Sequence, residues 1–166
     1  MNHGFSLLEL LISVTLLVTL LAFALPNMHS SLERKKVALL ADELHNLLVY
    51  AKTESIYRNC DLWVHISIDN ANNEAWQLHL TDSDTLGSGT TLRILASSDF
   101  EGLELRTSYT ANQIKLMGAT GKIKSGSLEI FSQRTPERRL KLKSSYAASR
   151  IVVCGVEGAW YGFTAC

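Results

Sequence analysis

Hydrophobic side chains fill one long segment near the N-terminus. From Phe5 to Leu25 the sequence runs for 21 residues with a single ionisable side chain, that of Glu9. An α-helix rises 1.5 Å per residue, so this segment spans about 30 Å, the hydrocarbon thickness of a bilayer. A cleaved secretory signal fits less well, because Met1–His3 has no Lys or Arg and the apolar stretch is long. The pattern therefore predicts a transmembrane helix over residues 5–26.

A second helical pattern of different character follows Pro26. Proline lacks an amide donor and disfavours helix at the preceding residue, so a kink or local melting is expected there. Over residues 27–58 apolar side chains recur at helical spacing and charged ones occupy the other faces, which predicts an amphipathic helix packed on a sheet. The predicted core-facing stripe consists of Leu40, Leu44, Leu47, Leu48, Ala51 and Ser55.

Beyond Asn59 the apolar period changes from 3.6 to 2, which is typical of half-buried strands. Strands are predicted at Leu62–Ile68, Trp76–Leu80, Leu92–Leu95, Leu103–Arg106, Ile114–Met117, Leu128–Phe131, Leu140–Leu142 and Ile151–Cys154. These segments give seven or eight short antiparallel strands packed on one helix, which predicts an α+β head over residues 59–166. A chain of 166 residues suffices for one compact domain with an appendage, but hardly for two cores.

Charge is balanced overall but unevenly distributed. Lys plus Arg and Asp plus Glu each number 16. Residues 28–112 contain 7 basic and 12 acidic side chains, whereas residues 113–166 contain 9 basic and 3 acidic ones. Six cations fall within 17 residues, and such a cluster can hold the phosphates of DNA. They are Arg134, Arg138, Arg139, Lys141, Lys143 and Arg150.

No catalytic or metal-binding pattern is found in the sequence. The five histidines lack the spacing of a zinc site, and Gly87–Thr91 lacks the lysine of a phosphate-binding loop. His65 and His79 fall on neighbouring predicted strands, where both are expected to be exposed. We therefore expect a protein that is not an enzyme and holds no metal or cofactor.

The residues around Glu9 form a specific motif. The run Gly4-Phe5-Ser6-Leu7-Leu8-Glu9-Leu10, followed by an apolar helix, resembles the class III prepilin signal of type IV pilins and type II secretion pseudopilins. In that family a prepilin peptidase cuts after the glycine and methylates the new N-terminal Phe. The resemblance implies that residues 1–4 are a leader, that Gly4 and Phe5 flank the cleaved bond, and that Glu9 is the assembly residue. Such leaders usually carry a Lys or Arg, whereas this one offers the α-amine and His3.

Electrostatics gives the implied motif a physical role. Cleavage leaves a positively charged amine on Phe5, which can pair with the Glu9 carboxylate of a neighbouring subunit. Neither charge is tolerated alone in an apolar setting, so the pair favours one axial stagger between subunits. The resemblance further implies that Pro26 loosens the helix in an assembled filament.

The head also resembles a subgroup of this family. Leu44–Ile56 followed by a strand over Asp61–Ile68, and Ile114–Gly121, are similar to the FimT/FimU minor pilins and H-type pseudopilins. The resemblance implies the type IV pilin fold.

Three cysteines leave the disulfide pairing open. Major pilins of the family close the C-terminus with a disulfide loop, and Cys154 and Cys166 are spaced for a loop of that kind. Pairing of Cys60 with either of the other two is the alternative.

These features predict a structural minor pilin of a type IV pilus that helps prime assembly or sits near the tip. The alternatives are an H-type pseudopilin of a type II secretion system and a FimT-like DNA receptor for natural transformation. The DNA receptor would carry a C-terminal Gly-Arg-x-Arg element, whereas this chain has Ser149-Arg150-Ile151-Val152 and no later Lys or Arg. The expected partners are other major and minor pilins, the prepilin peptidase and the assembly platform. The expected location is the bacterial inner membrane, with a single pass and a periplasmic head, and then a filament.

Overall fold

The structure, a computed structural model, describes residues 6–69 and 72–166, without the side chains of residues 23–30 and 72–74. The chain divides into two compact units, Met1–Lys35 and Lys36–Cys166. Helix α1 (Leu7–Arg58) contributes to both units. Helix α1 is continuous through Pro26. The kink or local melting expected near that residue, and the loosening implied for an assembled filament, stay predictions.

In the described part of the chain eight strands follow the helix, and each overlaps a segment that the alternating pattern predicted. Two short 3-10 helices, η1 (Ser97–Asp99) and η2 (Thr110–Asn112), lie between them. The strands are β1 (Leu62–Asp69), β2 (Asn72–Thr81), β3 (Thr91–Ala96), β4 (Leu103–Thr107), β5 (Gln113–Leu116), β6 (Gly126–Ser132), β7 (Thr135–Ser145) and β8 (Arg150–Gly155). The predicted α+β class and its antiparallel strands are confirmed.

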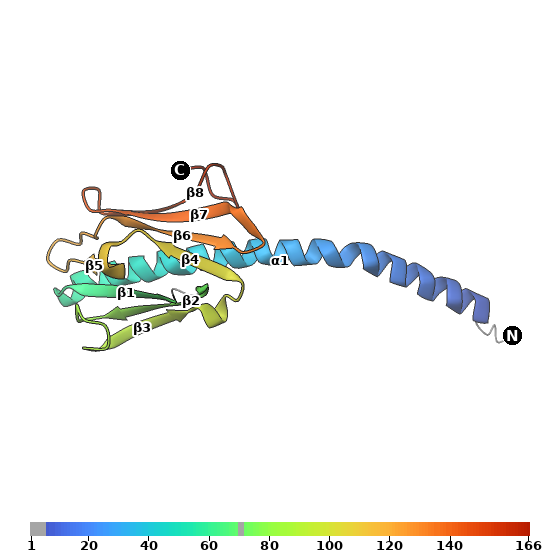
Figure 1. Cartoon of the computed structure of the whole chain (residues 1–166), viewed down its shortest axis with the longest axis horizontal. Coiled ribbons are helices and arrows are strands. Elements are labelled where there is room, and N and C mark those ends of the chain that lie inside the picture. The colour runs from blue at the N-terminus through green and yellow to red at the C-terminus, as the bar shows by residue number, and fades with distance from the viewer. Residues whose placement is uncertain (1–5, 70–71) are drawn as a thin grey trace. The chain divides into compact units, whose positions relative to one another are not determined.

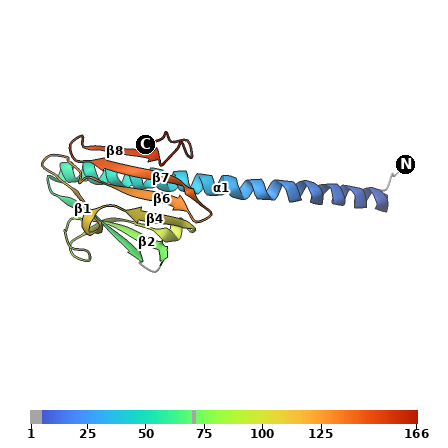
Figure 2. The ribbon, with the colours of Figure 1, turned by 45° about the horizontal axis from the view of Figure 1, so that its top comes forward.

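The strands form two four-stranded antiparallel sheets beside the second half of α1 (Figures 1 and 2). The first sheet has the order β3-β2-β1-β5 and the second has the order β4-β6-β7-β8. The two sheets adjoin where the indole nitrogen of Trp76 on β2 donates to the carbonyl of Leu103 on β4, at 3.1 Å. Trp76 is itself buried, so this bond satisfies the one polar atom of a large core side chain.

One hydrophobic core joins both sheets to the helix. The predicted stripe of α1 is confirmed, since all six of its members are buried; Val37 extends it toward the N-terminus, and Ala41 widens it. Facing this stripe are alternate residues of the strands, such as Val64 on β1, Leu105 on β4 and Leu142 on β7. The period of 3.6 on the helix and of 2 on the strands thus brings two sets of apolar side chains together.

His65 is an exception to the predicted pattern of exposure. The expectation of an exposed side chain was wrong, because only 6% of His65 is accessible. Its Nε2 lies 3.0 Å from the Thr81 hydroxyl and 2.9 Å from the carbonyl oxygen of Ser83. The turn that follows β2 therefore covers the outer side of β1 at this point.

The junction between helix and sheet is fixed by Asp61. One carboxylate oxygen of Asp61 accepts the backbone N–H of Gly118 at 3.1 Å, and the other lies 2.8 Å from the Lys115 ammonium. The hydrogen bond from Lys115 lowers the pKa of Asp61, and the Gly118 N–H acts in the same direction. A Cβ at Gly118 would collide with the backbone of Cys60, so the chain needs glycine at this close approach.

The C-terminal segment is attached to the edge of β8. A disulfide joins Cys154 to Cys166, and Cys60 is free and exposed. The backbone of Gly155 donates to Thr164 at 2.8 Å and accepts from Cys166 at 2.9 Å. The last residues thus lie beside the end of β8 as a short parallel extension.

Replacing Asp61 with Asn is expected to lower the free energy of unfolding at pH 7 by less than about 1 kcal/mol, the range of exposed ion pairs. Because folding lowers the pKa of Asp61, its contribution is present above the ordinary value of 3.8 and is lost as the pH falls below that value. Urea unfolding of both full chains in mild detergent at pH 7 and pH 2.5 measures the difference. An equal loss at both pH values would contradict this electrostatic assignment.

Replacing Cys166 with Ser is expected to lower the free energy of unfolding by about 2–4 kcal/mol. The disulfide closes a short loop, and its loss gives the unfolded chain more conformational freedom. Thermal unfolding under non-reducing conditions measures the effect. The matched control is Cys60→Ser, which removes a free, exposed thiol and is expected to change little. Equal effects of both substitutions would show that the disulfide does not stabilise the head.

Candidate functional site

The N-terminal part of α1 presents an almost continuous apolar surface. Leu7 is 81% accessible, and the other large apolar side chains through Leu21 are also exposed within their own unit. An apolar surface of this extent is stable only when lipid or protein covers it. Within the described part of the chain, no helix meets the length and hydropathy of a membrane span. Phe5 and the side chains of residues 23–26, which belong to the predicted segment 5–26, lie outside the described part.

Glu9 lies in the first turn of this helix and is exposed. The hydroxyl groups nearby bond to the helix backbone: Ser13 donates to the carbonyl of Glu9 at 2.7 Å, and Thr15 donates to that of Ile12 at 2.9 Å. No side chain among the described residues pairs with the Glu9 carboxylate. The segment thus satisfies its hydroxyls internally and leaves one negative charge available to another molecule.

The predicted cleavage site cannot be placed beside this acid. Gly4 and Phe5 both lie outside the described residues. Their roles, and the pairing of the Phe5 amine with Glu9, stay predictions.

The second half of α1 has an uncovered apolar face of its own. Leu39, Tyr50 and Tyr57 are exposed, and their spacings of 11 and 7 residues place them on one side of the helix. Tyr57 is 86% accessible. Sequence analysis did not single out these residues, although the spacing is visible in the sequence. They form a second surface that suits a packing partner.

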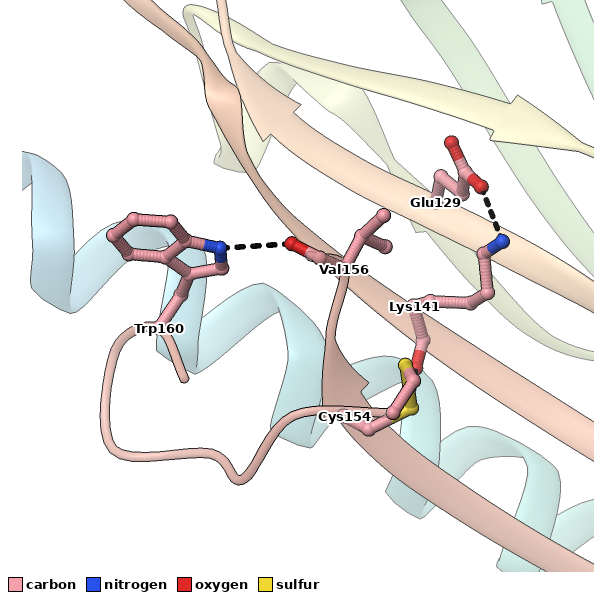
Figure 3. Close-up of a disulfide and its surroundings, with 6 residues drawn as sticks. Glu129, Lys141, Cys154, Val156 and Trp160 are labelled. Atoms are coloured by element: carbon pink, nitrogen blue, oxygen red, sulfur yellow. Dashed lines mark hydrogen bonds and ion pairs between the residues drawn. A yellow bond between two sulfur atoms is a disulfide. The ribbon is translucent and has the colours of Figure 1, made fainter. Parts of the chain in front are cut away.

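The six predicted cations do not form one continuous positive patch. The Lys141 ammonium lies 2.7 Å from the carboxylate of Glu129 on β6 (Figure 3). The guanidinium of Arg139 lies 3.5 Å from the same carboxylate. Arg138 lies 3.6 Å from Glu137 and 5.4 Å from the centre of the Trp160 ring. These contacts neutralise half of the cluster.

The other three cations are exposed. Arg134 lies in the turn between β6 and β7, whereas Lys143 and Arg150 lie on β7 and β8. None of the three has an ion-pair partner among the described residues. The cluster that looked continuous in sequence therefore divides into a paired set and a free set.

Two family models match the chain. The model described as "Type II transport protein GspH" matches residues 40–156, and the model described as "Prokaryotic N-terminal methylation motif" matches residues 1–25. The first covers more than half of the chain, including the helical stripe and all eight strands. No curated protein matches the chain.

Solved structures share the fold at low sequence identity. The crystal structure of the type IV minor pilin FimU from Pseudomonas aeruginosa matches with a TM-score of 0.59 and 18% identity, over 75% of this chain and 96% of that one. A second crystal form of FimU matches with a TM-score of 0.54 and 18% identity, over 70% and 94% of the two chains. The structure of the minor pseudopilin EpsH from Vibrio cholerae matches with a TM-score of 0.45 and 16% identity, over 73% of this chain and 96% of that one. The chain therefore belongs to the GspH family, within the group of minor pilins and H-type pseudopilins, and carries the prokaryotic N-terminal methylation motif.

Proposed function

We propose that the chain is a minor pilin of a type IV pilus, which helps prime assembly or sits near the tip. The observation that carries the proposal is the exposed apolar surface of α1, interrupted by the single carboxylate of Glu9. A surface of this kind needs an apolar environment, and its acid needs a positive partner. A filament of packed helices with free N-terminal amines supplies both.

In this proposal the prepilin peptidase cleaves between Gly4 and Phe5 and methylates the new amine. The amine of an incoming subunit then pairs with Glu9 of a subunit already in place. Removal of either partner leaves a charge unpaired in an apolar interface, which costs more than the pair contributes. The pair therefore acts mainly on the register between subunits.

The proposal assigns a role to each part of the chain. Residues 1–4 are a leader, residues 5–26 anchor the subunit in the inner membrane, and residues 27–58 join this anchor to the periplasmic head at 59–166. Pro26 provides a point where the helix loosens during assembly. The disulfide supports export, because such bonds persist in oxidising compartments. The partners are other pilins, the prepilin peptidase and the inner-membrane assembly platform.

The second candidate is an H-type pseudopilin of a type II secretion system. The family model favours this candidate, since its description names a type II transport protein. The apolar helix with its single carboxylate would act in the same way in both candidates. They differ in the assembly that the subunit joins, a type IV pilus or a type II secretion system. A role as DNA receptor is disfavoured, because acidic side chains flank Arg138, Arg139 and Lys141.

Replacement of Glu9 with Ala is expected to leave membrane insertion intact and to reduce incorporation into filaments at least tenfold. The apolar segment loses no hydrophobicity, but the incoming amine loses its counter-charge. The measurement is the ratio of subunit in sheared filaments to subunit in the membrane fraction, by immunoblot. Glu9→Asp keeps the charge and is expected to retain part of the incorporation.

The matched neutral control is Thr19→Ala, which removes a hydroxyl bonded only to the helix backbone. It is expected to incorporate normally. Wild-type incorporation of Glu9→Ala would contradict the pairing mechanism.

A strain lacking this gene, assayed for both surface pili and type II secretion, decides between the two machines. Loss of pili alone supports the minor pilin, and loss of secretion alone supports the pseudopilin.

A further inference from the structure

A groove lies on the outer face of the second sheet, beside the C-terminal segment. Its volume is about 540 Å³, within the range of protein binding sites. Hydroxyl groups of Ser127 and Ser145 and the side chains of Lys143 and Arg150 line it, and the disulfide-bonded residues close one end. The groove therefore combines hydrogen-bonding groups with positive charge.

The edge of β8 borders this groove and is unpaired over most of its length. The backbone N–H of Val156 donates to Arg139 of β7, whereas both backbone groups of Gly155 bond to the C-terminal segment on the other side. Backbone groups alternate in direction along a strand, so those of Ile151 and Val153 point to the same outer side as those of Gly155. No hydrogen bond joins these outer groups to another segment of the described chain.

An apolar edge strand of this kind is a template for another strand. Ile151 and Val153 turn their side chains toward the core, and Arg150 and Val152 face the groove. The C-terminal segment shows that this edge accepts backbone pairing, since it already bonds to Gly155. The first half of β8 offers the same geometry without an occupant among the described residues.

The positive charge of the groove favours an acidic occupant. Lys143 and Arg150 lie on adjacent antiparallel strands, where Arg150 is opposite Ser145 and diagonal to Lys143. Both are exposed and without an ion-pair partner among the residues that the structure describes. Side chains on one face of an added strand recur every second residue, at about 6.8 Å. A carboxylate on the added strand would therefore meet Arg150 on the adjacent strand, and the next carboxylate on the same face would lie opposite Val152, with Lys143 one strand further away.

We propose that the outer edge of β8 and the adjoining groove bind an extended, acidic segment of a partner polypeptide as an added β-strand. The unpaired backbone groups of Ile151 and Val153 supply the hydrogen bonds, and Arg150 with Lys143 selects the acidic sequence. This surface lies on the head and goes beyond the helix-driven assembly proposed above. An extended peptide uses both the backbone edge and the charge, whereas a nucleic acid would use the charge alone.

The test is fluorescence anisotropy with the full chain in mild detergent and a labelled, end-capped nonapeptide of alternating Glu and Val. The wild-type chain is expected to bind the peptide. The same peptide with N-methyl groups on alternate backbone amides cannot pair as a strand and is expected to bind at least tenfold more weakly. The double substitution Lys143→Gln and Arg150→Gln is expected to weaken binding about fivefold, as for two exposed charge pairs.

The matched control is Lys35→Gln with Lys36→Gln, which removes the same charge from exposed positions on α1. It is expected to bind as the wild type does. Equal affinity for the N-methylated peptide would overturn strand addition. Displacement of the peptide by a single-stranded oligonucleotide at lower concentration would identify a general polyanion site and also overturn the proposal. Absence of peptide binding up to about 1 mM would do the same.

Discussion

A carboxylate on an otherwise apolar helix surface is the constraint on which this molecule depends. In water the exposed leucines of α1 are unfavourable, and in hydrocarbon the charge of Glu9 is unfavourable. Only an environment that is apolar and also offers a positive group satisfies both. The match of residues 1–25 to the N-terminal methylation motif is consistent with such an environment. The helix thus specifies an assembly partner, whereas a fold built for isolation in water would bury these side chains.

The head can be understood as the part that folds in water. The second half of α1 buries one stripe under two sheets, and Leu39, Tyr50 and Tyr57 are exposed on another side of the helix. Polar contacts fix the points where the core alone is not specific, such as the carboxylate of Asp61 between Lys115 and Gly118. The disulfide fixes the C-terminal segment on β8 and so defines one end of the groove. The head thus keeps two surfaces free for contacts: the exposed side of α1 with Leu39, Tyr50 and Tyr57, and the groove beside β8.

Much of this architecture could be predicted because its signals are periodic. The buried stripe from Leu40 to Ser55 and the eight strands follow from repeats of 3.6 and 2, which local sequence displays directly. The burial of His65 could not be predicted, since it depends on where the turn after β2 folds back. The division of the basic cluster was also hidden, because Glu129 is adjacent to Arg139 and Lys141 only through the register of β6 and β7. Likewise, the sequence shows Ile151 and Val153 as strand residues but does not show that β8 is the last strand of its sheet. The periodic pattern of apolar residues does not show which distant segments lie next to each other.

We propose that the chain matures by exposing a new amine, which pairs with Glu9 of a neighbouring subunit. Mass spectrometry of the N-terminal peptide of the native protein, purified from membranes or filaments, tests it most directly. We expect the mature chain to begin at Phe5 and to carry one methyl group on its amine. A native chain that retains Met1 to Gly4 would contradict it, because no amine would then be available at the depth of the acid.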